Sequence, residues 1–111
     1  MESNYALYIK EREGKSIVED ECGFATYYYP EDNIVYVEDV FVKKEYRRTG
    51  KALEYFDKIT KEARDKGCEF CITSIDPKAK GALASLKWTL KNGYNFSKQK
   101  DGLNWYCKEI Q

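Results

Sequence analysis

Two features of the sequence have residue types and spacing that could do chemistry: a basic turn with a glycine, and a pair of adjacent carboxylates. The turn RRTGKA spans residues 47–52 and follows an apolar run that ends at Val42. The carboxylates, Glu38 and Asp39, lie inside that apolar run. Because a carboxylate in a buried strand costs free energy unless it is paired, two in succession favour a functional role.

The basic turn has the composition of a phosphate site at the start of a helix. The first amides of a helix have no partner within it, and the helix dipole places partial positive charge beside them. Gly50 allows a ligand to approach the backbone closely, and Ala52 keeps the entrance small. Positive charge comes from Arg47, Arg48 and Lys51. These residues predict a pyrophosphate site. The alternative is a solvated helix cap, since the GxxxxGK[ST] and GxGxxG spacings are both absent.

The two carboxylates could also have a purely structural role. One of them would pair with a lysine and the other would lie at the rim of the sheet. Neighbouring residues on a regular strand point to opposite faces. At most one of Glu38 and Asp39 is therefore expected on any one face of the sheet, unless a bulge intervenes.

Composition indicates a folded protein without general affinity for nucleic acids or membranes. The 111 residues favour one domain, residues 1–111, and the 42% apolar and 15% aromatic content is typical of globular chains. Lys+Arg and Asp+Glu both total 19, so there is no basic excess for either surface. No apolar run approaches the ~20 residues of a membrane span. The N-terminus MESNYALYIK lacks a signal-peptide pattern, so a cytoplasmic protein is expected.

The chain has four cysteines and no histidine. Cys68 and Cys71 form a CxxC inside a strand-like stretch, which has no turn residues to curl two thiolates around one metal. We therefore expect buried thiols and no metal site, with a zinc site or a redox pair as alternatives. The absence of histidine excludes a Ser-His or Cys-His nucleophile within the chain.

Residue periodicity predicts one sheet with two helices. The expected strands are Tyr5–Lys10, Phe24–Tyr29, Ile34–Val42, Glu69–Ile75, Tyr94–Ser97 and Leu103–Glu109, with Ser16–Val18 as a further candidate. The expected helices are Gly50–Lys66 and Lys78–Asn92. The order β-β-β-α-β-α-β-β indicates a mixed α/β (α+β) fold. The strands on either side of the first helix should be parallel and joined by a right-handed crossover.

The run VYVEDVFVKKEYRRTGKAL, residues Val35–Leu53, resembles motif A of the GNAT superfamily of acetyl-CoA-dependent N-acetyltransferases. In that family a strand ending in valine is followed by [Q/R]-x-x-G-x-[G/A] at a helix start. Arg47, Gly50 and Ala52 occupy the three defined positions. The phrase VEDVFV followed by YR is especially similar to the diamine and polyamine acetyltransferases. The expected order of elements also matches the family.

The resemblance implies a GNAT-like domain that uses acetyl-CoA as co-substrate and an amine as acceptor, either polyamine-like or a protein lysine or N-terminus. Backbone groups of Val40, Phe41 and Val42 would contact the pantetheine and the acetyl carbonyl. The pyrophosphate would be held by Arg47, Arg48, Thr49, Gly50, Lys51 and Ala52. The pantetheine would enter where the two parallel strands splay apart. Glu38 would be the acceptor-side base or cation anchor, with Asp39 as the other candidate catalytic carboxylate, and the amine would attack the thioester directly.

Two departures from the family pattern accompany the resemblance. Family members usually begin with a strand and two helices that wall the acceptor site, whereas this chain is expected to be a short form beginning at the second strand. The tyrosine that protonates the departing CoA thiolate is replaced by Thr89, a far poorer proton donor, and an asparagine that often contacts CoA is replaced by Ala82. Tyr106 is a candidate substitute for that tyrosine.

Those departures leave a second function open, a weak or inactive GNAT scaffold that binds CoA or a protein partner. Aromatic strands with edges to cover are also compatible with a homodimer.

Overall fold

The computed structural model describes residues 2–111, and within them six strands form one sheet in the order β1-β2-β3-β4-β6-β5. The strands are β1 (Ser16–Asp20), β2 (Gly23–Glu31), β3 (Ile34–Val42), β4 (Phe70–Ile75), β5 (Asn95–Lys100) and β6 (Leu103–Glu109). β3 and β4 pair in parallel, and the other neighbours pair antiparallel. The predicted mixed sheet and its parallel pair are confirmed.

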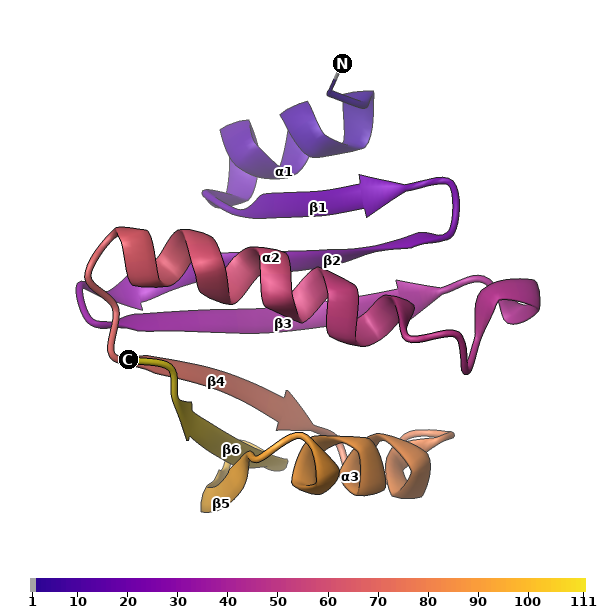
Figure 1. The fold of residues 1–111 in the computed structure, drawn as a ribbon, viewed down its shortest axis with the longest axis vertical. Coiled ribbons are helices and arrows are strands. Elements are labelled where there is room, and N and C mark those ends of the chain that lie inside the picture. The colour runs from indigo at the N-terminus through magenta and orange to yellow at the C-terminus, as the bar shows by residue number, and fades with distance from the viewer. Residues whose placement is uncertain (1) are drawn as a thin grey trace.

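The helices are α1 (Asn4–Glu13), α2 (Lys51–Asp65) and α3 (Ala82–Lys91), with a short 3-10 turn η1 (Lys44–Tyr46) before α2. Figure 1 shows α2 lying along β2 and β3, α1 beside β1, and α3 near β4. α2 is the crossover between the two parallel strands, as predicted. Among the residues described, no helix has the length and apolar character needed to cross a membrane.

The prediction of a strand at Tyr5–Lys10 is wrong, because α1 covers these residues. The Ser3 side chain accepts from the Ala6 amide at 3.0 Å, which caps the helix start. The two buried residues of α1, Ala6 and Ile9, are three apart, as on one face of a helix. Gly14 ends the helix at φ 67°. A helix therefore precedes the first strand, and the chain does not begin with a strand.

Two other boundaries differ from the sequence prediction. The candidate strand at Ser16–Val18 exists and extends to Asp20 as β1, so the order β-β-β-α-β-α-β-β holds from β1 onward. The second predicted helix starts four residues late, at Ala82. The Asp76 side chain accepts from the Lys78 amide at 2.9 Å, and this local bond competes with helix formation.

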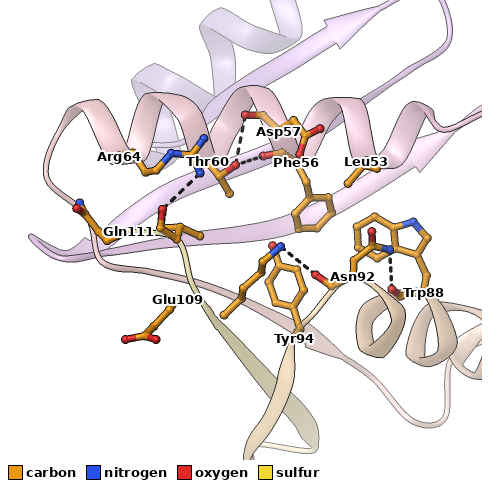
Figure 2. Close-up of a pocket in the computed structure, with 12 residues that line it drawn as sticks. Leu53, Phe56, Asp57, Thr60, Arg64, Trp88, Asn92, Tyr94, Glu109 and Gln111 are labelled. Carbon is orange, nitrogen blue, oxygen red and sulfur yellow. Dashed lines mark hydrogen bonds between the residues drawn. The ribbon is translucent and has the colours of Figure 1, made fainter.

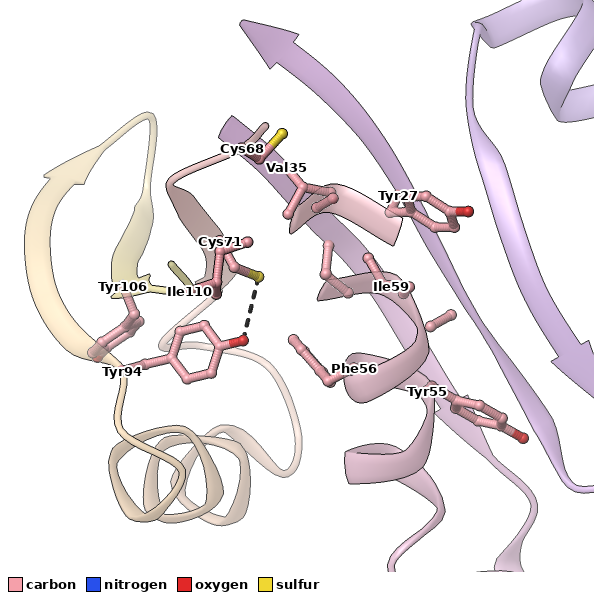
Figure 3. Packing of buried hydrophobic residues seen from close by; sticks show 13 residues of the cluster. Tyr27, Val35, Tyr55, Phe56, Ile59, Cys68, Cys71, Tyr94, Tyr106 and Ile110 are labelled. Carbon is pink, nitrogen blue, oxygen red and sulfur yellow. Dashed lines mark hydrogen bonds between the residues drawn. The ribbon is translucent and has the colours of Figure 1, made fainter. Parts of the chain in front are cut away.

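The core lies between the sheet and α2. Tyr55, Phe56 and Ile59 of α2 are buried against sheet residues that include Val35 and Val37. Figure 3 shows Phe56 and Ile59 pointing from α2 toward this cluster. The sequence period predicts an inward stripe of Leu53, Phe56, Ile59, Thr60 and Ala63 on this helix. The last four are buried, whereas Leu53 is 41% exposed, so the prediction is wrong for Leu53.

Cys68 and Cys71 are buried free thiols, as expected for packing residues. The hydroxyl of Tyr94 donates to the Cys71 sulfur at 3.2 Å (Figure 3). Burial raises the pKa of the Cys71 thiol to about 11. The thiol is therefore protonated and weakly nucleophilic at neutral pH.

Candidate functional site

A β-bulge lies at the paired carboxylates of β3. Tyr27 of β2 is opposite Val37, and Thr26, the residue before Tyr27, is opposite Asp39. Glu38 is therefore the extra residue of the bulge, without a partner on β2. A bulge of this kind interrupts the alternation of side chains along a strand.

Because of the bulge, Glu38 and Asp39 lie on the same face of the sheet. The Thr26 hydroxyl donates to Asp39 at 3.4 Å. Glu38 pairs with Lys15 at 2.5 Å, and the Lys15 ammonium lies 5.9 Å from the ring centre of Tyr28. Thr26 and Tyr28 are two residues apart on β2, so their side chains lie on the same face of the sheet. Asp39 lies beside Thr26 and Glu38 lies near Tyr28, so both carboxylates lie on that face as well. The arrangement that required a bulge is the one found.

Tyr36 closes the same face between β3 and β4. Its hydroxyl lies 2.6 Å from the hydroxyl of Ser74 on β4, and its ring centre lies 5.1 Å from that of Trp105, with the two rings tilted by 44°. Burial raises the pKa of the Tyr36 phenol, so the hydroxyl is protonated at neutral pH. The two strands are thus bridged by side chains close to the point where their pairing ends.

The parallel strands β3 and β4 separate beyond Val37. Their pairing runs from Ile34 to Val37 on β3, and the last partner on β4 is Thr73. The Thr73 hydroxyl donates to the Val37 carbonyl at 3.1 Å, which closes the paired segment. Beyond the bulge at Glu38, residues 39–42 of β3 are paired only with β2, so one edge of this segment is open.

Backbone groups of β3 point into this open edge. The Asp39 amide donates to the Thr26 hydroxyl of β2 at 3.2 Å, and the Lys43 amide donates to the carbonyl of Cys22, the residue before β2, at 2.7 Å. Because amides alternate in direction along a strand, those of Val40 and Val42 point away from β2. The Arg47 side chain donates to the Val42 carbonyl at 2.9 Å, where the edge meets the basic turn. The open edge therefore offers polar backbone groups and continues into the turn.

The turn that follows holds an uncommon backbone conformation. Arg48 has φ 63°, a left-handed value that few residues other than glycine adopt. The Thr49 hydroxyl donates to the Tyr46 carbonyl at 2.5 Å, which ties the turn to η1. Arg47 and Arg48 are both exposed, so their side chains can reach a ligand in front of the turn.

The start of α2 is left without a side-chain cap. The N-cap residue is Gly50, at φ 86°, which has no side chain to accept a hydrogen bond from the first amides of the helix. The first amide bonded within the helix is that of Glu54, which donates to the Gly50 carbonyl at 3.0 Å. The amides of residues 51–53 thus have no carbonyl partner in the helix. Such a helix start favours an anion.

Lys51 contributes its backbone to this site rather than its charge. Its ammonium pairs with Asp20 at 2.8 Å and with Glu54 at 3.1 Å. The Tyr55 hydroxyl also donates to Asp20, at 2.6 Å. Bonds from Lys51 and then Tyr55 hold the pKa of the Asp20 carboxyl well below its usual range. The side-chain charge in front of the turn therefore comes from the two arginines.

Comparison with known proteins identifies the family of the chain. The model of the acetyltransferase (GNAT) family matches residues 2–88. The chain belongs to the GNAT acetyltransferase family. No curated protein sequence matches the chain.

Solved GNAT structures share the fold at low sequence identity. The PaiA N-acetyltransferase of Thermoplasma acidophilum, solved with coenzyme A, has a TM-score of 0.71 and 16% identity over 79% of this chain and 53% of its own. A GNAT acetyltransferase of Elizabethkingia anophelis, solved with acetyl-CoA, has a TM-score of 0.72 and 10% identity over 96% and 83%. A Klebsiella pneumoniae putative acyl-CoA N-acyltransferase has a TM-score of 0.69 and 14% identity over 81% and 64%. The chain thus spans between half and two thirds of two of these three relatives.

The GNAT chain does not present a free hydroxyl at the position of the expected tyrosine. Thr89 is buried on α3, and its hydroxyl donates to the Ser85 carbonyl at 2.7 Å. Tyr106, the suggested substitute, is buried in the core, with its ring 5.8 Å from Phe96. Ala82 is the first residue of α3 and brings no polar side chain.

A cavity of about 230 Å³ lies between α2, α3 and the end of the chain (Figure 2). Phe56 and Trp88 form one wall, with ring centres 4.8 Å apart. The Lys108 ammonium, which also lines the cavity, donates to the Asn92 carbonyl at 2.9 Å. None of the predicted site residues lines this cavity. The turn and the open edge of β3 instead form an exposed backbone surface, which suits a long, charged ligand better than a closed pocket does.

Proposed function

We propose that this GNAT chain is an N-acetyltransferase that moves the acetyl group of acetyl-CoA directly to an amine. The observation that carries the proposal is the continuity of two backbone donor sets. The open edge of β3 at Val40–Val42 leads through the turn to the uncapped start of α2. A pantetheine arm needs amide partners along an extended path, and a pyrophosphate needs a helix start. Two similar solved structures hold CoA or acetyl-CoA, which supports the same ligand here.

The proposed roles follow the geometry. The backbone groups of Val40 and Val42 hold the pantetheine and polarise the acetyl carbonyl, whereas the amide of Phe41, the third residue of the predicted set, points toward β2 by the same alternation. The pyrophosphate is held by Arg47, Arg48, Thr49, Gly50, Lys51 and Ala52. Glu38 and Asp39 face the acceptor side, where a carboxylate takes a proton from the attacking ammonium. The amine nitrogen bonds to the acetyl carbon while the C–S bond breaks, and CoA leaves as a thiolate that takes up a proton.

The test compares two changes at one glycine. Asp and Asn are both favoured N-cap residues and both tolerate positive φ, so Gly50→Asp and Gly50→Asn differ chiefly in charge. A Cβ at Gly50 meets nothing within 4 Å, so both side chains fit the ligand-free protein. Calorimetry with acetyl-CoA is expected to show Gly50→Asp binding at least about tenfold more weakly than Gly50→Asn, because the carboxylate repels the pyrophosphate. Equal affinities of the two variants would overturn the cofactor site.

Transfer itself is tested by CoA release with a panel of diamines, polyamines and lysine peptides. A second candidate function, a GNAT scaffold that binds CoA or a protein partner without turnover, is favoured by the engaged hydroxyl of Thr89. Tight acetyl-CoA binding without thioester cleavage for any amine would select this second function. The homodimer stays a prediction that sedimentation would test, with the outer edges of β1 and β5 as its candidate contacts.

A further inference from the structure

The carboxylate proposed for the acceptor side already holds an ammonium, that of Lys15. This residue follows Gly14 at the end of α1 and lies in the sequence far from β3. Its nitrogen is 2.5 Å from Glu38 and 3.2 Å from Glu13, and it lies 5.9 Å from the ring centre of Tyr28. Two carboxylates and the face of an aromatic ring are groups that bind an alkylammonium.

The ion pair of Lys15 and Glu38 is partly buried, unlike a fully exposed surface ion pair. The side chains of Lys15 and Glu38 are 22% and 28% exposed. The Glu38 oxygen that faces Lys15 is shielded from solvent and, in the part of the chain described, has no polar partner besides the Lys15 ammonium. If Lys15 left, that oxygen would lose its counter-charge, which is costly unless another cation arrives. The hydrogen bond to Glu38 raises the pKa of the Lys15 ammonium above its usual value, so the group stays charged.

There is empty space next to the pair. Lys15 lines a cavity of about 460 Å³ between α1 and β1, together with residues that include Ala6, Ile17 and Val18. The lysine side chain therefore has a volume into which it can withdraw. Glu38 sits at the bulge, directly before the open edge of β3 where the proposed acetyl carbonyl is held.

Building on the acetyl transfer proposed above, we infer that Lys15 determines which acceptors the site accepts. Its ammonium occupies the place beside Glu38 that the charged end of an alkylamine acceptor takes. An acceptor must displace Lys15 before Glu38 can hold its cation or take its proton. The site is therefore matched to a primary alkylammonium, the group that a lysine side chain itself carries, and the wild-type chain competes with its own substrate.

The test uses Lys15→Met, which keeps most of the side-chain length but removes the charge. The matched control is Lys87→Met, since Lys87 is an exposed lysine of α3 that does not line the cavity beside Lys15 and for which the described structure shows no ion pair. Calorimetry measures the binding of 1,4-diaminobutane to each protein, with and without bound CoA. Lys15→Met is expected to bind the diamine at least about tenfold more tightly than wild type, and Lys87→Met within about twofold of wild type. Lys15→Arg, which keeps the charge, should behave like wild type.

The double variant Lys15→Met/Glu38→Gln ties the effect to the carboxylate, and it should lose the gain in affinity. The inference is overturned if Lys15→Met binds the diamine no better than wild type, or if the double variant keeps the gain. Thermal unfolding of each variant shows whether it is folded. The titration without CoA distinguishes a failure of this inference from a failure of the proposed acetyl-CoA site. Even if the protein did not bind CoA, the affinities of the variants for the diamine could still be compared.

With an amine that wild type acetylates, Lys15→Met should lower KM for that amine and leave kcat unchanged. A lower kcat at unchanged KM would instead make Lys15 part of the chemistry and contradict its role as a competitor.

Discussion

The hydroxyl of Thr89 donates to the carbonyl oxygen of Ser85, 2.7 Å away and one turn earlier on α3. Thr89 is also buried, at 4% exposure, so its proton is held inside the helix and away from any thiolate. Thr89→Val keeps the shape and removes the hydroxyl. We expect CoA release with a productive amine to stay within about twofold of wild type. Removing a working general acid would cost ~10²–10⁴-fold, and a loss of that size would restore Thr89 as the proton donor.

Glu38→Gln is the comparison for that measurement. If Glu38 takes the proton of the acceptor, this variant should lose about 100-fold or more in turnover while acetyl-CoA still binds. Equal changes of turnover in Thr89→Val and Glu38→Gln would contradict the proposal that Glu38 takes the proton of the acceptor while Thr89 has no part in catalysis.

Gly23 determines how closely β2 approaches the open end of β3. A Cβ at this position would lie 2.0 Å from the carbonyl oxygen of Phe41 and 2.9 Å from the Cα of Val42, and both are backbone atoms that cannot turn aside. We expect Gly23→Ala to lower the free energy of unfolding by about 2 kcal/mol or more, measured by urea denaturation. Acetyl-CoA binding should weaken as well, because the displaced strand carries the proposed pantetheine contacts.

Gly14→Ala is the matched control for that change. Gly14 has a left-handed φ of 67°, but a Cβ there meets nothing within 4 Å. Only the conformational cost remains, about 1–2 kcal/mol, and acetyl-CoA binding should be unchanged. An unaltered acetyl-CoA affinity in Gly23→Ala would show that the strand tolerates the side chain without moving.

Asp20 connects β1 to α2 through Lys51 and Tyr55. Its pKa is lower in the folded chain than in the unfolded one, because Lys51 and then Tyr55 bond to the ionised carboxylate. Such a group stabilises the fold above its unfolded pKa, near pH 4, and the stabilisation is lost as the pH falls toward the folded pKa. Asp20→Asn should therefore lower the unfolding free energy at pH 7 by about 0.5–1 kcal/mol, since solvent screens the pair.

Thermal unfolding at pH 7 and pH 2 checks this expectation. The difference between wild type and Asp20→Asn should be largest at pH 7 and shrink at pH 2. Glu21→Gln removes the neighbouring exposed carboxylate and should change stability little at either pH. A difference for Asp20→Asn that grows toward low pH would contradict the pairing.

Features of the fold that depend on near neighbours were predictable. Phe56, Ile59 and Ala63 follow the helical period and are buried as predicted, although Leu53 of the same predicted stripe is exposed. The Asp101-Gly102 turn was also predictable, because both residues take positive φ, at 55° and 77°. The N-terminal helix was missed, since YALYIK reads equally as an alternating strand. The Ser3 cap and Gly14 were the local signals that could have identified the helix.

By itself, the sequence determined the family, the crossover helix and the glycine turn before it, because these depend on residue types within a few positions of one another. Only the tertiary structure decided the state of the charged groups. Lys15 reaches Glu38 across 23 residues, and Lys51 is turned toward Asp20 across 31. No local pattern encodes such pairs, since they follow from strand register and from the bulge at Glu38. The bulge also placed both carboxylates on one face, where strand alternation alone would have separated them.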